Sequence, residues 1–179
     1  MAVRGSSAVL AAADLPLRAA VVTAPGAAPA PGRLLDDERL AEVRRGFTDL
    51  LAVGPHLEPH LKGVLDDTLQ HPGSLLRAQL AYGLLLDGGA DPETSLELAV
   101  AIEYFHTASL LLDDLPAMDD GLLRRGQPCA HRVHGEGAAI LGALGLITRA
   151  YALLWQGIAT LEPERRRIAG GLVEECLGV

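Results

Sequence analysis

Helical spacing of the apolar residues, repeated from about residue 36 to the C-terminus, is the feature that most constrains the fold of this chain. Six segments carry leucine, valine and alanine three and four positions apart, and glycine, proline and aspartate separate them. No segment alternates apolar and polar residues between turn signals, as a strand would. The pattern predicts an all-α fold of about six helices in an orthogonal or bundle-like array. The expected helices span residues 38–53, 59–70, 75–86, 92–114, 135–158 and 163–179.

Capping residues mark three of the expected helix starts. Asp36, Ser74 and Asp91 each precede an apolar run and offer a side-chain oxygen to the first free backbone N–H groups. Pro92 occupies the first helical position after Asp91, where its missing N–H costs nothing. The helix expected over residues 135–158 is apolar nearly all round, which predicts a central position in the fold.

The first 32 residues differ in composition from the rest of the chain. They are rich in alanine, glycine and proline and show no sustained helical period, which is typical of a disordered extension. Arg4 followed by an alanine-rich run resembles a targeting peptide, but Asp14 interrupts the run and little basic charge precedes it. We therefore expect a disordered N-terminal extension over residues 1–32 and one domain over residues 33–179.

Charge and composition exclude several classes of protein. A net charge of −8, with 15 Lys and Arg against 23 Asp and Glu, does not suit a protein that binds nucleic acid phosphates. Aromatic residues make up 3%, too few for stacking on single strands. Cys129 and Cys176 cannot form a disulfide framework; they indicate free thiols in a reducing compartment, so we expect a cytoplasmic protein. The apolar run over residues 137–147 is too short to span a bilayer.

Four carboxylates lie within residues 113–120, directly after an apolar helical segment. They are Asp113, Asp114, Asp119 and Asp120. The C-terminal end of a helix already carries partial negative charge, so carboxylates crowded there are unfavourable without a cation. Mg²⁺ prefers oxygen ligands and commonly joins one or two carboxylates to the phosphates of a substrate. The cluster therefore predicts a Mg²⁺ site.

Arg124 and Arg125 follow the acidic cluster after a short turn. A guanidinium group donates two parallel hydrogen bonds to phosphate oxygens. An acidic cluster followed by paired arginines is therefore the layout of a site that holds a diphosphate through a metal and a cation together. The alternative is a solvated acidic turn beside a basic surface patch.

Residues 103–141 resemble the first aspartate-rich region of the trans-isoprenyl diphosphate synthases, the polyprenyl synthetases that include farnesyl and geranylgeranyl diphosphate synthases. The match comprises a DDxxxxD motif, an RRG-x-P motif, and His131 and Gly135-Glu136 at the family spacing. Weaker similarity extends from about residue 34 to the C-terminus. The resemblance implies an isoprenoid-synthase fold around a central cavity, of which this chain would be the N-terminal portion. It also implies Mg²⁺-dependent condensation of an allylic prenyl diphosphate with isopentenyl diphosphate.

The resemblance assigns roles to individual residues. The Mg²⁺ ligands that it implies are Asp113, Asp114 and Asp119. It implies that Arg124 contacts the allylic diphosphate and Arg125 the isopentenyl diphosphate. His106 and Arg77 match family residues that contact isopentenyl diphosphate. Because members of the family are usually dimers, it also implies a homodimer or a heterodimer with a related synthase.

Two further positions are expected to set the length of the product. Ala108 and Ser109 lie about one helical turn before Asp113, where they would line the path of the growing prenyl chain. Both are small, which favours a geranylgeranyl-type product over a farnesyl product. The alternative is that they only permit close helix packing.

The chain also departs from the family pattern. Ser74 and Leu75 stand where the family carries a lysine and an arginine that bind isopentenyl diphosphate, and the aspartate of a later Gly-Asp pair is replaced by Leu144. The second aspartate-rich motif of the family lies beyond residue 179. The sequence therefore leaves three interpretations open: a fragment of a longer enzyme, a pseudoenzyme that binds a prenyl diphosphate, or a non-catalytic helical subunit that modulates a full-length synthase.

Overall fold

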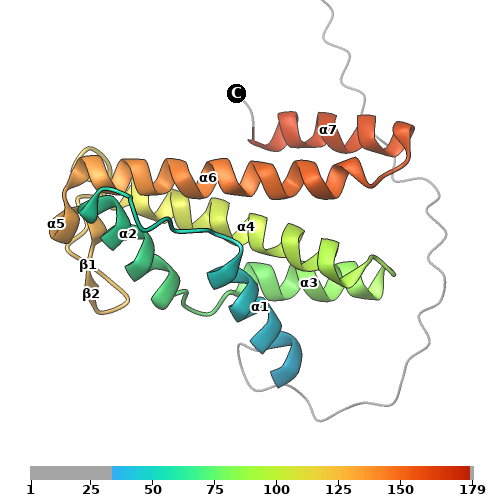
Figure 1. Cartoon of the computed structure of the whole chain (residues 1–179), viewed down its shortest axis with the longest axis horizontal. Coiled ribbons are helices and arrows are strands. Elements are labelled where there is room, and N and C mark those ends of the chain that lie inside the picture. The colour runs from blue at the N-terminus through green and yellow to red at the C-terminus, as the bar shows by residue number, and fades with distance from the viewer. Residues whose placement is uncertain (1–33, 178–179) are drawn as a thin grey trace, which may run out of the picture.

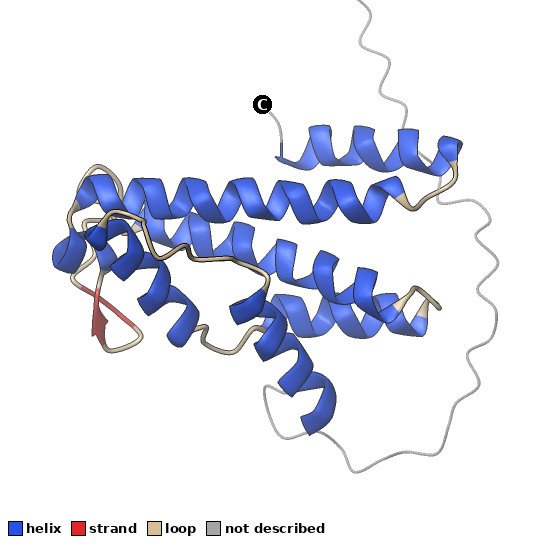
Figure 2. Cartoon of the chain, viewed as in Figure 1, coloured by secondary structure: helices blue, strands red, loops and turns tan. Residues whose placement is uncertain are grey.

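The computed structural model describes residues 34–177, which form seven helices and one short hairpin (Figures 1 and 2). The predicted all-α class is confirmed; the extension predicted over residues 1–32 lies outside the described residues. The helices are α1 (Asp37–Asp49), α2 (Pro59–Gln70), α3 (Leu76–Asp87), α4 (Pro92–Asp113), α5 (Ala130–His134), α6 (Glu136–Ala159) and α7 (Pro163–Leu177). The hairpin consists of β1 (Leu123–Arg124) and β2 (Gln127–Pro128).

Helices α4 and α6 lie side by side and form the centre of the fold (Figure 1). Helices α1 and α3 pack against α4, α2 and α5 pack against the first turns of α6, and α7 lies along the other end of α6. Phe47 of α1 and Tyr104 of α4 are fully buried, with ring centroids 5.1 Å apart, and the Tyr104 hydroxyl donates to the Phe47 carbonyl over 2.7 Å. These contacts fix the end of α1 on the middle of α4.

The start of α3 differs from the expectation that Ser74 caps it. The N-cap is Leu75, which has a left-handed backbone (φ 52°) and a buried side chain, and no side chain of the cap itself bonds to the helix. The buried Glu103 carboxylate on α4 instead accepts a hydrogen bond from the Ala78 N–H over 2.9 Å. Burial of the leucine and a carboxylate from a neighbouring helix thus replace the local cap.

Helix α1 and the connection between α4 and α6 also depart from the expected pattern. Helix α1 ends at Asp49 rather than at residue 53, and the chain runs irregularly to α2. Two short elements, the β1–β2 hairpin and helix α5, were not expected, because strands of two residues are too short to show alternation. Together they connect the end of α4 to the start of α6, where the predicted site lies.

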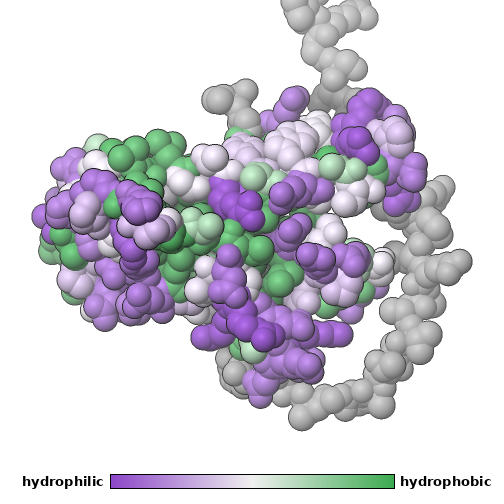
Figure 3. All heavy atoms as spheres, in the orientation of Figure 1, coloured by the Kyte–Doolittle hydropathy of each residue, from purple (hydrophilic) through white to green (hydrophobic). Residues whose placement is uncertain are grey.

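Helices α4 and α6 are long and apolar enough to cross a membrane by length and composition alone, a test that buried core helices also pass. Helix α6 continues to Ala159, beyond the apolar run that ends at residue 147, and Arg149 within it donates from Nε to the Leu50 carbonyl. Apolar side chains are exposed on this helix, among them Leu141 (54%) and Leu144 (49%). Figure 3 shows apolar (green) spheres over the first turns of α6, at the upper left.

Candidate functional site

The acidic turn begins where α4 ends. Asp113 is the last residue of α4, and Asp114 is its C-cap. The chain then turns back, and the Asp119 N–H donates to the Asp113 carbonyl over 2.9 Å. This bond brings the backbones of Asp113, which is partly buried, and Asp119, which is exposed, next to each other. Asp114 is buried, with only 5% of its surface exposed, so the aspartates of the motif occupy different environments.

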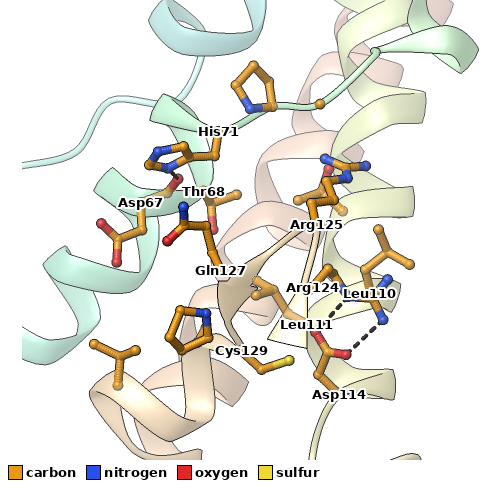
Figure 4. Close-up of a pocket in the computed structure, with 16 residues that line it drawn as sticks. Asp67, Thr68, His71, Leu110, Leu111, Asp114, Arg124, Arg125, Gln127 and Cys129 are labelled. Atoms are coloured by element: carbon orange, nitrogen blue, oxygen red, sulfur yellow. Dashed lines mark hydrogen bonds and ion pairs between the residues drawn. The ribbon is translucent and has the colours of Figure 1, made fainter. Parts of the chain in front are cut away.

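Asp114 is paired with Arg124 of β1. The guanidinium donates from Nε to Oδ2 over 2.6 Å and from Nη2 to Oδ1 over 2.7 Å, a two-pronged ion pair (Figure 4). Burial alone raises the pKa of Asp114, but the hydrogen bonds and charge of Arg124, assisted by the Cys129 thiol, outweigh burial and lower it. The carboxylate is therefore ionised at neutral pH, and its pair with Arg124 is charged on both sides.

The hairpin turn places Arg125 beside the loop between α2 and α3. Arg125 and Gly126 occupy the two central turn positions, both with positive φ (53° and 80°), as in a type I′ hairpin. For arginine this backbone costs about 1–2 kcal/mol. The Arg125 guanidinium lies against Gly73, where a side-chain carbon would be only 2.8 Å from the farther nitrogen, Nη2. Gly73 (φ 72°) thus provides both a turn conformation and the space that the guanidinium fills.

A group of positive charges surrounds His106. Burial lowers the pKa of the His106 imidazole, and the charges of Arg77, Arg125 and Arg124 lower it further, while Glu103 partly opposes them. The imidazole is therefore neutral at pH 7. Arg77 of α3 and Arg125 of the hairpin thus both lie within electrostatic range of His106 on α4. Neither Arg77 nor Arg125 forms an ion pair within residues 34–177.

A cleft of about 590 Å³ opens beside the hairpin (Figure 4). In Figure 4 the side chains of α2 face those of α4 across the hairpin residues. Three of the predicted site residues line this cleft: Asp114, Arg124 and Arg125. The lining residues that sequence reasoning missed include Asp67, Thr68, His71, Gln127 and Cys129. Helix α2 carries no chemical motif that would reveal its place in this wall.

The other predicted residues lie outside the lining of this cleft. Arg77, His106, Asp113 and Asp119 do not line it. His106 and Asp113, two helical turns apart, lie on one face of α4. Ala108 is fully buried in the hydrophobic core, as the packing interpretation expects, whereas Ser109 is exposed and donates to the His106 carbonyl over 2.8 Å. Of the two chain-length candidates, Ser109 is therefore the one accessible to a ligand.

The carboxylates suit Mg²⁺ better than a metal held by protein ligands alone. Across residues 34–177, no three His, Cys, Asp or Glu side chains come close enough together to hold a metal ion. Buried His131 has no hydrogen-bond partner in this part of the chain, and His134 bonds through Nε2 to Asp67 over 2.8 Å. Mg²⁺ usually takes one or two carboxylates and completes its shell with water and substrate phosphates. Asp113 and Asp119 fit that role.

Comparisons with known proteins agree with this arrangement. The sequence model of the Polyprenyl synthetase family matches residues 58–169. The geranylgeranyl diphosphate synthase of Pseudescherichia vulneris is 37% identical over 139 residues, which cover 69% of this chain and 45% of that protein. The farnesyl diphosphate synthase of Geobacillus stearothermophilus is 44% identical over 94 residues, which cover 52% of this chain and 32% of that protein.

Solved structures show the same relationship. An isoprenoid synthase family member from Thermotoga neapolitana matches with a TM-score of 0.65 and 30% identity, covering 76% of this chain and 52% of that one. An FPP/GFPP synthase from Zymomonas mobilis matches with a TM-score of 0.67 and 26% identity, covering 79% and 51%. The chain thus spans about half the length of these proteins, and up to 45% of the two sequence relatives. The family match includes α4, the acidic turn and the hairpin, and the chain belongs to the polyprenyl synthetase family.

Proposed function

We propose that this chain binds an allylic prenyl diphosphate in a Mg²⁺-dependent manner, as part of a prenyltransferase that joins it to isopentenyl diphosphate. One observation carries the proposal: the backbones of Asp113 and Asp119 lie next to each other at the end of an apolar helix, beside a hairpin whose Arg125 forms no ion pair within residues 34–177. Carboxylates that share a metal with a diphosphate, and guanidinium groups that bind its remaining oxygens, are the groups that such a ligand requires.

The proposed reaction breaks the allylic C–O bond and leaves a diphosphate with additional negative charge. Arg125 and Arg77, which the resemblance assigns to isopentenyl diphosphate, would hold that substrate by hydrogen bonds to its phosphate oxygens. Arg124 would donate to the leaving diphosphate and stabilise the charge that develops on it in the transition state. Mg²⁺, when bound, would act as a Lewis acid on the leaving diphosphate. The isopentenyl double bond attacks the allylic carbocation, and a proton is then lost. The apolar side chains of α4 would keep water from the carbocation.

The second candidate function is a pseudoenzyme or non-catalytic helical subunit that binds a prenyl diphosphate or modulates a full-length synthase. Ser74 is exposed without a charge, and Leu75 is 1% exposed in the core, so neither replaces the missing cations. Each lost charged contact to a transferring phosphate costs about 2–4 kcal/mol in the transition state. Two such losses would remove a large part of the roughly 8–23 kcal/mol by which enzymes lower barriers.

Mg²⁺-dependent binding is the first expected result. Geranyl diphosphate is titrated calorimetrically into the chain, once with excess Mg²⁺ and once with a chelator. We expect at least about tenfold tighter binding with Mg²⁺, because the metal joins the diphosphate to the carboxylates. Asp113→Ala should abolish that difference. Asp87→Ala is the matched control, because Asp87 also ends an apolar helix but lies at the end of α3. Equal affinity with and without Mg²⁺ would support the solvated-turn interpretation.

The chain by itself is expected to show little or no condensation of allylic and isopentenyl diphosphates, because Ser74 and Leu75 replace two cations. A radiolabelled isopentenyl diphosphate assay measures this directly. Binding without condensation would favour the non-catalytic candidate for this chain. Turnover on the order of 1 s⁻¹, an ordinary enzyme value, would contradict the expectation and support catalysis by the chain as it stands.

A further inference from the structure

Asp114 differs from its neighbours in the aspartate-rich motif in both burial and bonding. Its side chain is buried, and each carboxylate oxygen accepts a hydrogen bond from Arg124. The buried Cys129 thiol lies beside the carboxylate. A side-chain carbon on Gly121 would lie 2.7 Å from Oδ1, so backbone also closes over the carboxylate. Asp114 is thus enclosed by protein groups on several sides.

Backbone hydrogen bonds hold the two ends of the hairpin: the Gly121 N–H donates to the Asp114 carbonyl over 3.0 Å, and the Cys129 N–H donates to the Leu122 carbonyl over 3.2 Å. The hairpin ladder pairs Leu123 with Pro128 and Arg124 with Gln127, and an isolated two-stranded hairpin is marginally stable at best. The two leucines at its start do not anchor it by burial, because Leu122 and Leu123 are each 66% exposed. Among the described residues, the side-chain contact that joins the hairpin strands to the end of α4 by hydrogen bonds is the two-pronged ion pair of Arg124 with Asp114.

The position of Arg125 depends on the same contact. Arg125 follows Arg124 directly and has an unfavourable left-handed backbone, so its guanidinium stays against Gly73 only while the turn is held. We propose that Asp114 is a positioning residue: it holds Arg124, and with it the β1–β2 hairpin, so that Arg125 faces the cleft. Asp114 then takes no part in metal binding, which is left to Asp113 and Asp119. This revises the expectation of three metal ligands and rests on the proposed function for the choice of anion.

Hydrogen exchange of the whole chain tests the anchor without any ligand. Asp114→Asn is expected to speed exchange of the backbone amides in residues 121–129 at least tenfold, while those of α4 and α6 stay protected. Arg124→Gln should produce the same change, and the double variant should add nothing further, because both remove one interaction. Asp113→Asn is the matched control and should leave the hairpin unchanged. Unchanged exchange in Asp114→Asn would overturn the proposal.

A milder variant covers the case in which Asp114→Asn does not fold. Arg124→Lys keeps the charge but loses the two-pronged geometry, and it is expected to speed hairpin exchange by a smaller factor. Hairpin exchange equal to that of the parent chain in Arg124→Lys would overturn the idea that the paired geometry holds the hairpin.

Affinity for inorganic pyrophosphate without metal separates positioning from simple electrostatics. Removing the negative charge of Asp114 should strengthen anion binding if charge alone matters. Loss of the anchor should instead weaken it, at least threefold, because Arg125 is no longer held at the cleft. Tighter binding in Asp114→Asn would overturn the proposal. If the parent chain binds no pyrophosphate, the proposed function fails, while hydrogen exchange still decides the role of Asp114.

Metal binding supplies the last measurement. Mn²⁺ binding in the presence of pyrophosphate is measured by electron paramagnetic resonance. In Asp114→Asn, the affinity for Mn²⁺ should fall by no more than the factor by which the metal-free affinity for pyrophosphate falls. Asp113→Asn should lose Mn²⁺ binding without any loss of metal-free pyrophosphate affinity. Loss of Mn²⁺ in Asp114→Asn beyond its loss of pyrophosphate affinity would make Asp114 a ligand and overturn the proposal.

Discussion

Gly73→Ala is expected to weaken pyrophosphate binding at least about tenfold, the largest effect of a single methyl group at this site. The added carbon would overlap the Arg125 guanidinium, because it would lie only 2.8 Å from Nη2 and closer still to the rest of the group. Arg125 would have to leave the loop, and a charge-assisted contact to the anion would be lost with it. Isothermal titration of the purified variant with pyrophosphate measures the effect.

The control for this variant is Gly89→Ala. Gly89 has nearly the same backbone (φ 79° against 72°), but a side-chain carbon there would meet no described atom within 4 Å. Both variants therefore carry the same backbone strain of about 1–2 kcal/mol, and only Gly73→Ala displaces Arg125. Equal affinity of both variants for pyrophosphate would show that Arg125 has no part in anion binding.

Phe47→Ala is expected to lower the free energy of unfolding by about 3–5 kcal/mol. Phe47 is fully buried, and its ring packs 5.1 Å from that of Tyr104, so truncation leaves a cavity between α1 and α4. The Tyr104 hydroxyl bonds to the backbone carbonyl of residue 47, which the substitution retains, so the loss comes from packing. Because whole domains are stable by about 5–15 kcal/mol, urea unfolding should show a large shift of the midpoint.

Two further variants calibrate the result. Leu84→Ala removes a side chain that is 63% exposed and should change the free energy of unfolding by no more than about 0.5 kcal/mol. Phe47→Leu retains most of the volume and should fall between the two. A loss below about 1 kcal/mol in Phe47→Ala would show that α1 contributes little to the core around Tyr104.

Local sequence patterns were enough to predict the main helices and the family. The apolar spacing predicted α4 and α6 to within two residues at either end, because each segment buries one face and its period is a property of the chain itself. The DDxxxxD and RRG-x-P motifs located the acidic turn and the arginines, because both lie within one continuous stretch. The same stretch supported the family, which the comparisons confirm.

Tertiary contacts decided which residues of these motifs are paired and buried and which are exposed. Nothing in the order of residues distinguishes Asp113 from Asp114; the helix turns by about 100° between them, so one remains partly exposed while the other meets Arg124. Likewise, Ser74 has the better capping side chain, yet Leu75 is the N-cap of α3. Burial of Leu75 and the hydrogen bond from the Ala78 N–H to Glu103 of another helix outweigh the local preference for serine.

The sequence could not reveal the α2 wall of the cleft or the contact of Arg125 with Gly73, because both depend on tertiary contacts. Gly73 and Arg125 are 52 positions apart, and only the packing of α2, α3 and the hairpin around α4 brings them together. The sequence by itself therefore determined the helices and the chemical groups of the site, which depend on short-range periodicity and composition. The tertiary structure alone decided which groups are paired, buried or free to meet a ligand, because burial depends on neighbours from distant segments.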